Sequence, residues 1–348
     1  MMNIAQKNTG HRRSNGSKLA ALAIAAVLAL TACGESNGSN QGAASPSASS
    51  TASSSAAAEA TSSASAQADE AATRMFKDWT GHEVEIPTHP QRVIFHSDTT
   101  GDIFALGVTP VGILKDNTPG TVFEEQAASV EDAGFPISAE KALQLQPDLI
   151  VFGNSDEAVY EQLSKVAPTV TFDSFASMED RVATLGELLG KQEEAAAWVA
   201  QYKEQEAAMW KAIRESGVGE NETASVVTMY PGNRLFVMLA AGLPQLLYSE
   251  GGFKQNEMVE SSMKEELGFL EISAEKLPDY AGDRLFVLTP VAEDAQNEMS
   301  ELMSGAVWKG LPAVKNGYVY EFPILTAGSD ASSRLWLMEE LPKVLANR

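Results

Sequence analysis

The stretch KQEEAAAWVAQYKEQEAAMWKAIRES, residues 191–216, decides the fold of this chain of 348 residues. It contains neither proline nor glycine. Apolar side chains recur within it at the spacing of one helix face: Val199, Tyr202, Met209 and Ile213. The stretch therefore predicts one helix of about 25 residues, roughly 35–40 Å long at about 1.5 Å per residue. Such a helix can serve as a stiff connection between two lobes.

On both sides of this stretch, short apolar strands alternate with helical segments. The expected strands before it lie in RVIF, TPVGIL, PDLIVFG and TVTF, and those after it in ASVVTMY, RLFVML, DRLFVLT and GYVYEF. This alternation is typical of parallel sheets that helices cover on both faces. The sequence therefore predicts an α/β chain with two Rossmann-like lobes joined by one long, rigid helix.

The pentapeptide ISAEK occurs twice, at residues 137–141 and 272–276. Each copy lies shortly before a buried strand, PDLIVF in the first half and GDRLFVL in the second. The copies therefore mark the same βαβ unit in two related lobes. Ser138 and Ser273 can cap the helices that follow, and the next glutamate then lies beside the positive helix end. This local role explains either copy alone, but not their equivalent placement.

Residues 1–32 are predicted to be a signal peptide. A basic segment without acids precedes LAALAIAAVLAL, residues 19–30, which is too short to span a membrane and has the length of a signal-peptide core. LTAC follows, with Cys33 directly after small residues. This motif resembles the bacterial lipoprotein box, which implies that Cys33 is diacylated and becomes the new N-terminus. The alternative is a plain secretory signal with an incidental cysteine.

Cys33 is the only cysteine, so the exported chain has no disulfide or thiolate cluster to offer. Residues 33–72 are rich in Ser and Ala and are predicted to be a flexible, lipid-anchored tether, because they bury too little apolar surface to become ordered. The formal charge is −22, and loss of the four basic residues before Cys33 brings it to −26. This charge excludes nucleic acid as a partner and argues against direct binding to an anionic membrane.

The remaining chain is predicted to contain a leading hairpin, an N-terminal lobe, an interlobe helix and a C-terminal lobe. These parts are assigned to residues 73–90, 91–190, 191–216 and 217–348. Gly81 is expected at the turn of the hairpin.

From Arg92 to Arg348 the chain resembles the iron-siderophore and cobalamin substrate-binding proteins of ABC importers. The resemblance is carried by RVIFHSDTTGDIFALGVTPVGI, ISAEKALQLQPDLIVFG, the long helix and VWKGLPAVKNGYVYEF. It implies an extracytoplasmic, lipid-anchored monomer that delivers a ferric siderophore to two transmembrane permease subunits with an ATPase on the far side. It also implies that Glu140 and Glu275, one on each lobe, dock onto arginine pockets of these subunits.

In this family the ligand lies between the lobes, at the carboxyl ends of strands, as in open α/β sheets generally. The matching loops contain the predicted ligand-binding residues Lys115, Tyr230, Arg234 and Arg334. Alternatively, Lys115 is a solvated loop lysine and Arg234 braces the turn at Gly232. Arg334 could instead cap its helix or pair with Asp330. Tyr230 replaces an arginine of some catechol-binding relatives, which weakens the case for a highly anionic ligand.

These few cationic candidates favour a nearly neutral, hydroxamate-type ferric complex over catecholate or citrate complexes. The chelator already holds the iron, so no cofactor or protein metal site is expected. A haem- or cobalamin-binding protein of the same fold is one alternative, since a single Tyr or His can ligate haem iron. A two-lobed zinc- or manganese-binding lipoprotein is another, but His82, His89 and His96 are few for such a site. No dinucleotide-binding motif or P-loop occurs, and no enzymatic activity is expected.

Overall fold

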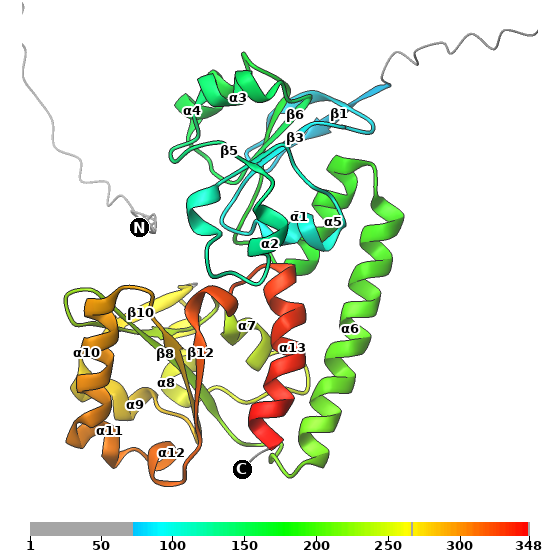
Figure 1. Cartoon of the computed structure of the whole chain (residues 1–348). Helices are drawn as coiled ribbons and strands as arrows, with labels where there is room; N and C mark the ends of the chain where they lie inside the picture. Colours follow the sequence, from blue (N-terminus) through cyan, green and yellow to red (C-terminus); the bar gives the residue numbers. More distant parts are fainter. Residues whose placement is uncertain (1–71, 266, 347–348) are drawn as a thin grey trace, which may run out of the picture. The chain divides into compact units, whose positions relative to one another are not determined.

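The computed structural model describes residues 72–265 and 267–346, which lie within one compact unit of the chain. The predictions for residues 1–71, including the signal peptide and Cys33, fall outside the described residues. Figure 1 shows two lobes, each built around a β-sheet, with the long helix α6 running beside them. The predicted architecture of two α/β lobes joined by one long helix is confirmed.

The N-terminal lobe contains a five-stranded sheet in the order β5-β4-β3-β6-β7, and all neighbouring strands are parallel. The strands are β3 (Val93–His96), β4 (Gly112–Ile113), β5 (Glu131–Asp132), β6 (Leu149–Phe152) and β7 (Thr169–Thr171). The helices are α1 (Gly101–Ala105), α2 (Glu124–Ala127), α3 (Ala139–Leu145), α4 (Glu157–Leu163) and α5 (Met178–Leu189). Every residue of β3, β6 and β7 is buried, as expected for parallel strands covered on both faces.

The C-terminal lobe contains a five-stranded sheet in the order β10-β9-β8-β11-β12. The strands are β8 (Ala224–Tyr230), β9 (Arg234–Met238), β10 (Phe269–Ile272), β11 (Arg284–Thr289) and β12 (Val319–Pro323). The helices are α7 (Leu243–Leu247), α8 (Glu257–Met263), α9 (Leu277–Tyr280), α10 (Glu293–Ser304), α11 (Ala306–Gly310), α12 (Pro312–Lys315) and α13 (Ala331–Ala346).

The prediction of a parallel sheet is wrong for β9 in the C-terminal lobe, and β10 was not among the predicted strands. β8, β11 and β12 are parallel, but β9 is antiparallel to β8, and β10 is antiparallel to β9. The reason is the tight turn between Tyr230 and Arg234, where Gly232 and Asn233 both adopt positive φ, of 88° and 58°. Glycine and asparagine tolerate this backbone region, so the chain reverses without a crossover helix.

The two copies of ISAEK precede equivalent central strands, β6 and β11, but differ locally. In the first copy, the Ser138 hydroxyl accepts a hydrogen bond from Lys141 N and caps α3. In the second, a single 3₁₀ turn at Ala274–Lys276 comes before α9, and the Ser273 side chain makes no cap bond. Lys276 N donates instead to the Ser273 carbonyl, and Pro278 lies in the first turn of α9, where it has no N–H to donate back to this turn.

The leading hairpin consists of β1 (Thr73–Lys77) and β2 (Glu83–Pro87), with Gly81 in the connection at a φ of +102°. Asp78 is buried below the connection and accepts backbone hydrogen bonds from Gly81, His82 and Thr171. Because Thr171 ends β7, these bonds attach the hairpin to the edge of the N-terminal sheet.

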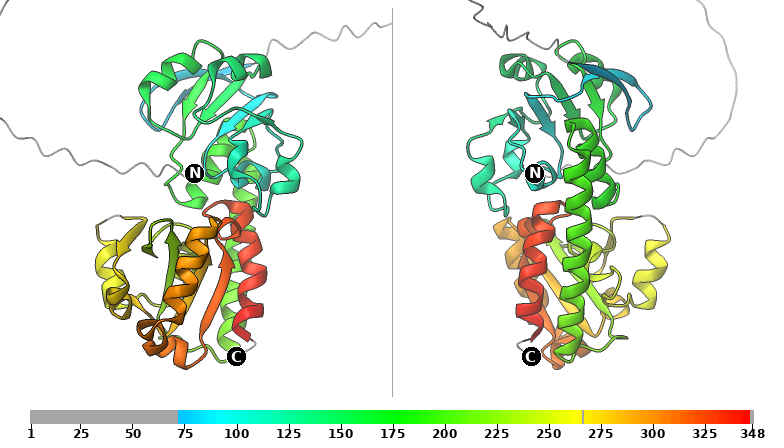
Figure 2. Two further views of the ribbon diagram at one scale, coloured as in Figure 1. Left: turned by 60° about the vertical axis from the view of Figure 1, so that its left-hand side comes forward. Right: turned by 90° about the vertical axis from the view of Figure 1, so that its right-hand side faces the viewer.

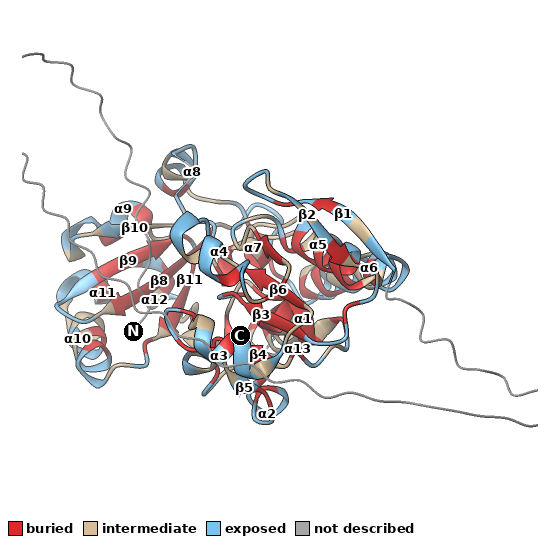
Figure 3. Cartoon of the chain, turned by 90° about the horizontal axis from the view of Figure 1, so that it is seen from above, coloured by how far each residue is buried: buried red, intermediate tan, exposed pale blue. Residues whose placement is uncertain are grey.

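Helix α6 (Gln192–Glu215) has 24 residues and buries the predicted face, including Tyr202, Met209 and Ile213. It runs beside α13, as Figure 2 shows. One hydrophobic cluster joins the two lobes and both helices. Figure 3 shows the buried residues concentrated in the strands of both sheets. Among the described residues, no helix is long and apolar enough to cross a membrane.

Candidate functional site

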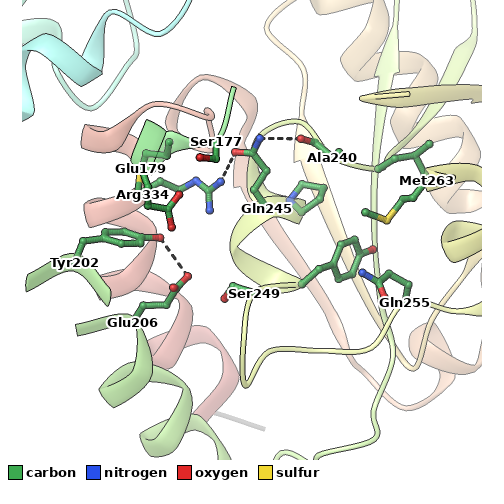
Figure 4. Close-up of a pocket in the computed structure, with 14 residues that line it drawn as sticks. Ser177, Glu179, Tyr202, Glu206, Ala240, Gln245, Ser249, Gln255, Met263 and Arg334 are labelled. Carbon is green, nitrogen blue, oxygen red and sulfur yellow. Dashed lines mark hydrogen bonds between the residues drawn. The ribbon is translucent and has the colours of Figure 1, made fainter. Parts of the chain in front are cut away.

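A pocket of about 330 Å³ lies between the lobes (Figure 4). The first turn of α5 forms one side, α6 and α13 contribute a second, and the C-terminal lobe supplies the rest. Its lining consists of Ser177, Met178, Glu179, Tyr202, Glu206, Leu239, Ala240, Pro244, Gln245, Tyr248, Ser249, Gln255, Met263 and Arg334. Hydroxyl, amide and charged groups thus face an otherwise apolar space, as in many small-molecule sites.

Arg334 is the only cation in this lining and is 3% exposed. Its Nη2 donates a hydrogen bond to the Gln245 side-chain oxygen, whereas its Nε has no acceptor among the described residues. Burial lowers the pKa of Arg334, while Tyr202 and Glu206 oppose that effect. A guanidinium has five N–H donors, and leaving them unbonded away from water is costly. The Nε is fully buried, so the group left for an oxygen-bearing ligand is Nη1, which has no acceptor among the described residues.

Two carboxylates offset the charge of Arg334. Glu206 accepts a hydrogen bond of 3.2 Å from the Tyr202 hydroxyl, and burial raises the pKa of Glu206. Glu179 lines the same pocket from the first turn of α5. Burial also raises the pKa of Tyr202, which stays a neutral donor at physiological pH. With one arginine and two glutamates, the lining has no net positive charge.

Of the predicted ligand-binding residues, only Arg334 lines this pocket. Its side chain bonds to Gln245, and its backbone N–H, not its guanidinium, bonds to the Asp330 carbonyl. The alternative of an Arg334–Asp330 ion pair therefore finds no support in the contacts of the described residues.

Lys115 lies in the N-terminal lobe, directly after β4. Its ammonium donates to the carbonyl oxygens of Ala128 and Val130, at 3.0 and 2.6 Å. These bonds hold the segment that follows α2, so the side chain is not simply solvated.

Tyr230 and Arg234 lie together at the β8–β9 turn, on either side of Phe236. The Tyr230 ring meets Phe236 edge-on at 5.2 Å, and the Arg234 guanidinium lies over Phe236 at 5.0 Å. Arg234 also donates to Glu271 on β10, at 3.1 and 2.7 Å. Arg234 therefore braces β9 against β10 rather than the turn at Gly232.

Glu140 and Glu275 are both exposed, one on each lobe. The lysine that follows each glutamate pairs with another acid: Lys141 with Asp132, and Lys276 with Asp279. A hydrogen bond from its own backbone, and a second from Ser273, lower the pKa of Glu275.

Two of the three histidines in the described residues, His96 and His82, make contacts within the N-terminal lobe and its hairpin. His96 is buried and contacts the Gly134 carbonyl at 2.9 Å, and burial lowers its pKa. His82 contacts Asp78 and stacks on Tyr160 at 3.9 Å. No group of three or more His, Cys, Asp or Glu residues that could hold a metal ion occurs in the described part of the chain.

Glu179, Tyr202, Glu206 and Gln245 line the pocket but were not predicted as site residues. Tyr202 was assigned to the packing face of the long helix, and it does pack there. The available signal was Glu206, an acid one turn after Tyr202 on the same helix.

The structure has two α/β lobes, one long connecting helix and a polar pocket between the lobes. These features define the class of substrate-binding proteins with a single long interlobe helix. The family model described as periplasmic binding protein matches residues 93–324. The chain belongs to the periplasmic binding protein family.

Individual relatives agree with this assignment. The iron(3+)-hydroxamate-binding protein YxeB of Bacillus subtilis is 28% identical over 258 residues, which cover 72% of this chain and 78% of that protein. The structure of Staphylococcus aureus SirA complexed with staphyloferrin B superposes with a TM-score of 0.70 at 29% identity, over 78% of this chain and 98% of SirA. The FhuD protein from S. pseudintermedius gives a TM-score of 0.69 at 25% identity, over 80% of this chain and 99% of that protein.

Proposed function

We propose that this protein is the extracytoplasmic substrate-binding component of an ABC importer and that it captures a ferric siderophore of the hydroxamate type. The observation that carries the proposal is Arg334, which lines the pocket between the lobes and whose Nη1 has no acceptor among the described residues. Oxygen atoms of a bound ferric complex would accept hydrogen bonds from this guanidinium.

The charge of the pocket supports a nearly neutral complex. Arg334 faces Glu179 and Glu206, whereas Lys115 and Arg234 are engaged with carbonyl groups and Glu271. Catecholate and citrate complexes of iron carry several negative charges and would meet uncompensated carboxylates here. Two relatives at 28% identity, YxeB and FhuD of Bacillus subtilis, are named as iron(3+)-hydroxamate-binding proteins.

Delivery to the permease is proposed to use Glu140 and Glu275. Both carboxylates are exposed, and the neighbouring lysines are already paired with other acids, so each glutamate offers its full charge to a partner. We also propose that Cys33 carries the lipid anchor and that the domain acts as a monomer. For Lys115, Tyr230 and Arg234, contact with the ligand stays a prediction.

Titration of tryptophan fluorescence tests the ligand. Trp198 stacks on Tyr202 at 5.5 Å, and Tyr202 lines the pocket, so ligand binding should change the emission. We expect saturable binding of ferric ferrioxamine B or ferrichrome, with weaker responses to ferric citrate and ferric enterobactin. Binding of haem, cobalamin or free zinc, without a response to any ferric siderophore, would refute the proposal. Trp198→Phe should abolish most of the signal without changing the affinity measured by calorimetry.

A further inference from the structure

The first turn of α13 carries Arg334, but the N-terminal lobe holds much of this turn in place. Ala331 N donates a hydrogen bond of 2.8 Å to Asp102 on α1. The Ser332 hydroxyl donates a bond of 2.8 Å to the Gly101 carbonyl. The first N–H groups of a helix lack partners within the helix, so an outside acceptor fixes the position of this end.

Arg181, on α5, completes the junction between the lobes. Its Nε donates to Asp102 at 2.7 Å, its Nη1 to the Ala176 carbonyl at 2.8 Å and its Nη2 to the Ser329 carbonyl at 2.6 Å. Arg181 and Asp102 are 1% and 0% exposed. The planar guanidinium of Arg181 thus bonds to α1, to the start of α5 and to Ser329. Such a fork has a fixed geometry that a lysine ammonium cannot reproduce.

The turn has little freedom to shift within this junction. Asp330 is buried, and its carboxylate accepts hydrogen bonds from the backbone and the hydroxyl of Ser333, at 2.9 and 2.7 Å. A Cβ atom on Gly101 would lie only 1.8 Å from the Asp330 carboxylate. Arg334 N bonds to the Asp330 carbonyl at 3.0 Å, so the backbone of Arg334 belongs to the same rigid turn.

We propose that Arg181 and Asp102 are positioning residues for ligand binding. They hold the first turn of α13 from the opposite lobe and thereby aim the Arg334 guanidinium into the pocket. The inference rests on the proposed function, since it assigns to Arg334 the contact with the ferric complex. It adds that the affinity of this contact depends on a buried ion pair that does not itself line the pocket.

Arg181→Lys in the mature chain is the first test, with ferric ferrioxamine B as the probe. The single ammonium can stay near Asp102 but cannot also reach both carbonyl groups. We expect the affinity to fall about tenfold, within the range of coupling between residues of one hydrogen-bond network. Arg284→Lys is the control, because Arg284 is also buried, at 4% exposed, and bonds to Glu222 at 2.5 Å, away from the pocket. This control should bind the probe as the wild type does.

A double-mutant cycle with Arg334→Ala separates positioning from a general loss of stability. If Arg181 acts through Arg334, Arg181→Lys should change the affinity less than about twofold in the Arg334→Ala background. An equal loss in both backgrounds would overturn the proposal. If Arg181→Lys fails to fold, Ser332→Ala replaces it, because this change removes one hydrogen bond to Gly101 and leaves no buried charge unpaired.

Amide hydrogen exchange gives a readout that needs no ligand. Arg181→Lys should speed the exchange of the Ala331, Ser333 and Arg334 amides, and Arg284→Lys should not. Unchanged protection of these amides would also overturn the positioning role. The wild type could bind no ferric siderophore while Arg181→Lys still speeds amide exchange. The proposed function would then be wrong, but Arg181 would still be shown to hold the first turn of α13.

Discussion

At the scale of single residues, Arg334 is the residue proposed to donate hydrogen bonds to the ligand. Arg334→Gln should weaken the binding of a ferric hydroxamate by about 1.5–3 kcal/mol, the usual contribution of hydrogen bonds to charged groups. That corresponds to roughly 10- to 150-fold in affinity. The melting temperature should fall only modestly, because the described contacts give Arg334 one side-chain hydrogen bond to lose, that to Gln245. Calorimetry of the folded variant checks both expectations, and unchanged affinity would remove Arg334 from the site.

His82 makes the stability of the leading hairpin depend on pH. The hydrogen bond to Asp78 raises the pKa of His82 above its ordinary value of 6.5, and Glu157 acts in the same direction. Its stabilising contribution is therefore complete below about pH 6.5 and is lost as pH rises through the raised value. Buried His96 opposes this trend, because its lowered pKa favours the neutral form.

Comparison with His82→Gln isolates this contribution from that of His96. The wild type should exceed the variant in melting temperature by more at pH 5.5 than at pH 8.5. Thermal unfolding at the two pH values measures this difference, and a gap that is equal at both would contradict the role of His82.

At the scale of elements, the sequence predicted α6 well and the pocket poorly. A long segment without Pro or Gly has few alternatives to a helix, so its bounds differed little from Gln192–Glu215. Pattern alone could not show that Tyr202 and Glu206 turn part of that helix toward a ligand site, because the same residues also pack against the fold. The second ISAEK copy also differs from expectation. It forms a 3₁₀ turn before α9, without a hydrogen bond from the helix to the Ser273 side chain, and Pro278 follows in the first turn of α9.

The packing of α1 against α13 gives a test of this junction between elements. Gly101→Ala should raise helix propensity by about 1 kcal/mol, yet it places a Cβ atom 1.8 Å from the Asp330 carboxylate. The cost of overpacking, about 1–3 kcal/mol of stability, should exceed the gain in helix propensity and lower the melting temperature. Gly310→Ala, in α11, is the control because a Cβ there meets nothing within 4 Å. Equal behaviour of both variants in thermal unfolding would contradict the tight contact.

At the scale of the whole molecule, each of the two related lobes presents an exposed glutamate in its copy of ISAEK, Glu140 and Glu275. The double variant Glu140→Gln, Glu275→Gln should keep its melting temperature and siderophore affinity but lose permease binding and transport. Removing one partner of a desolvated charge pair costs about 2–5 kcal/mol of association. Transport by reconstituted importer vesicles and binding to the isolated permease measure the effect.

Replacement of Glu161 and Glu301 by Gln is the matched control, since both are exposed and lie on different lobes. This control should transport normally. Normal transport by the Glu140 and Glu275 double variant would exclude the docking role, and loss of siderophore binding would place these glutamates at the pocket.

The dependence of the N-terminal lobe on Ser329, Ala331 and Ser332 has a consequence for biosynthesis. Asp102 and Arg181 are made well before the groups that complete their hydrogen bonds, which follow 229 and 148 residues later in the chain. A nascent chain that stops before residue 329 would hold this buried ion pair without its final partners. The first lobe can therefore complete its hydrogen bonds only after synthesis has passed residue 332, and chains that stop earlier should be degraded rather than accumulate.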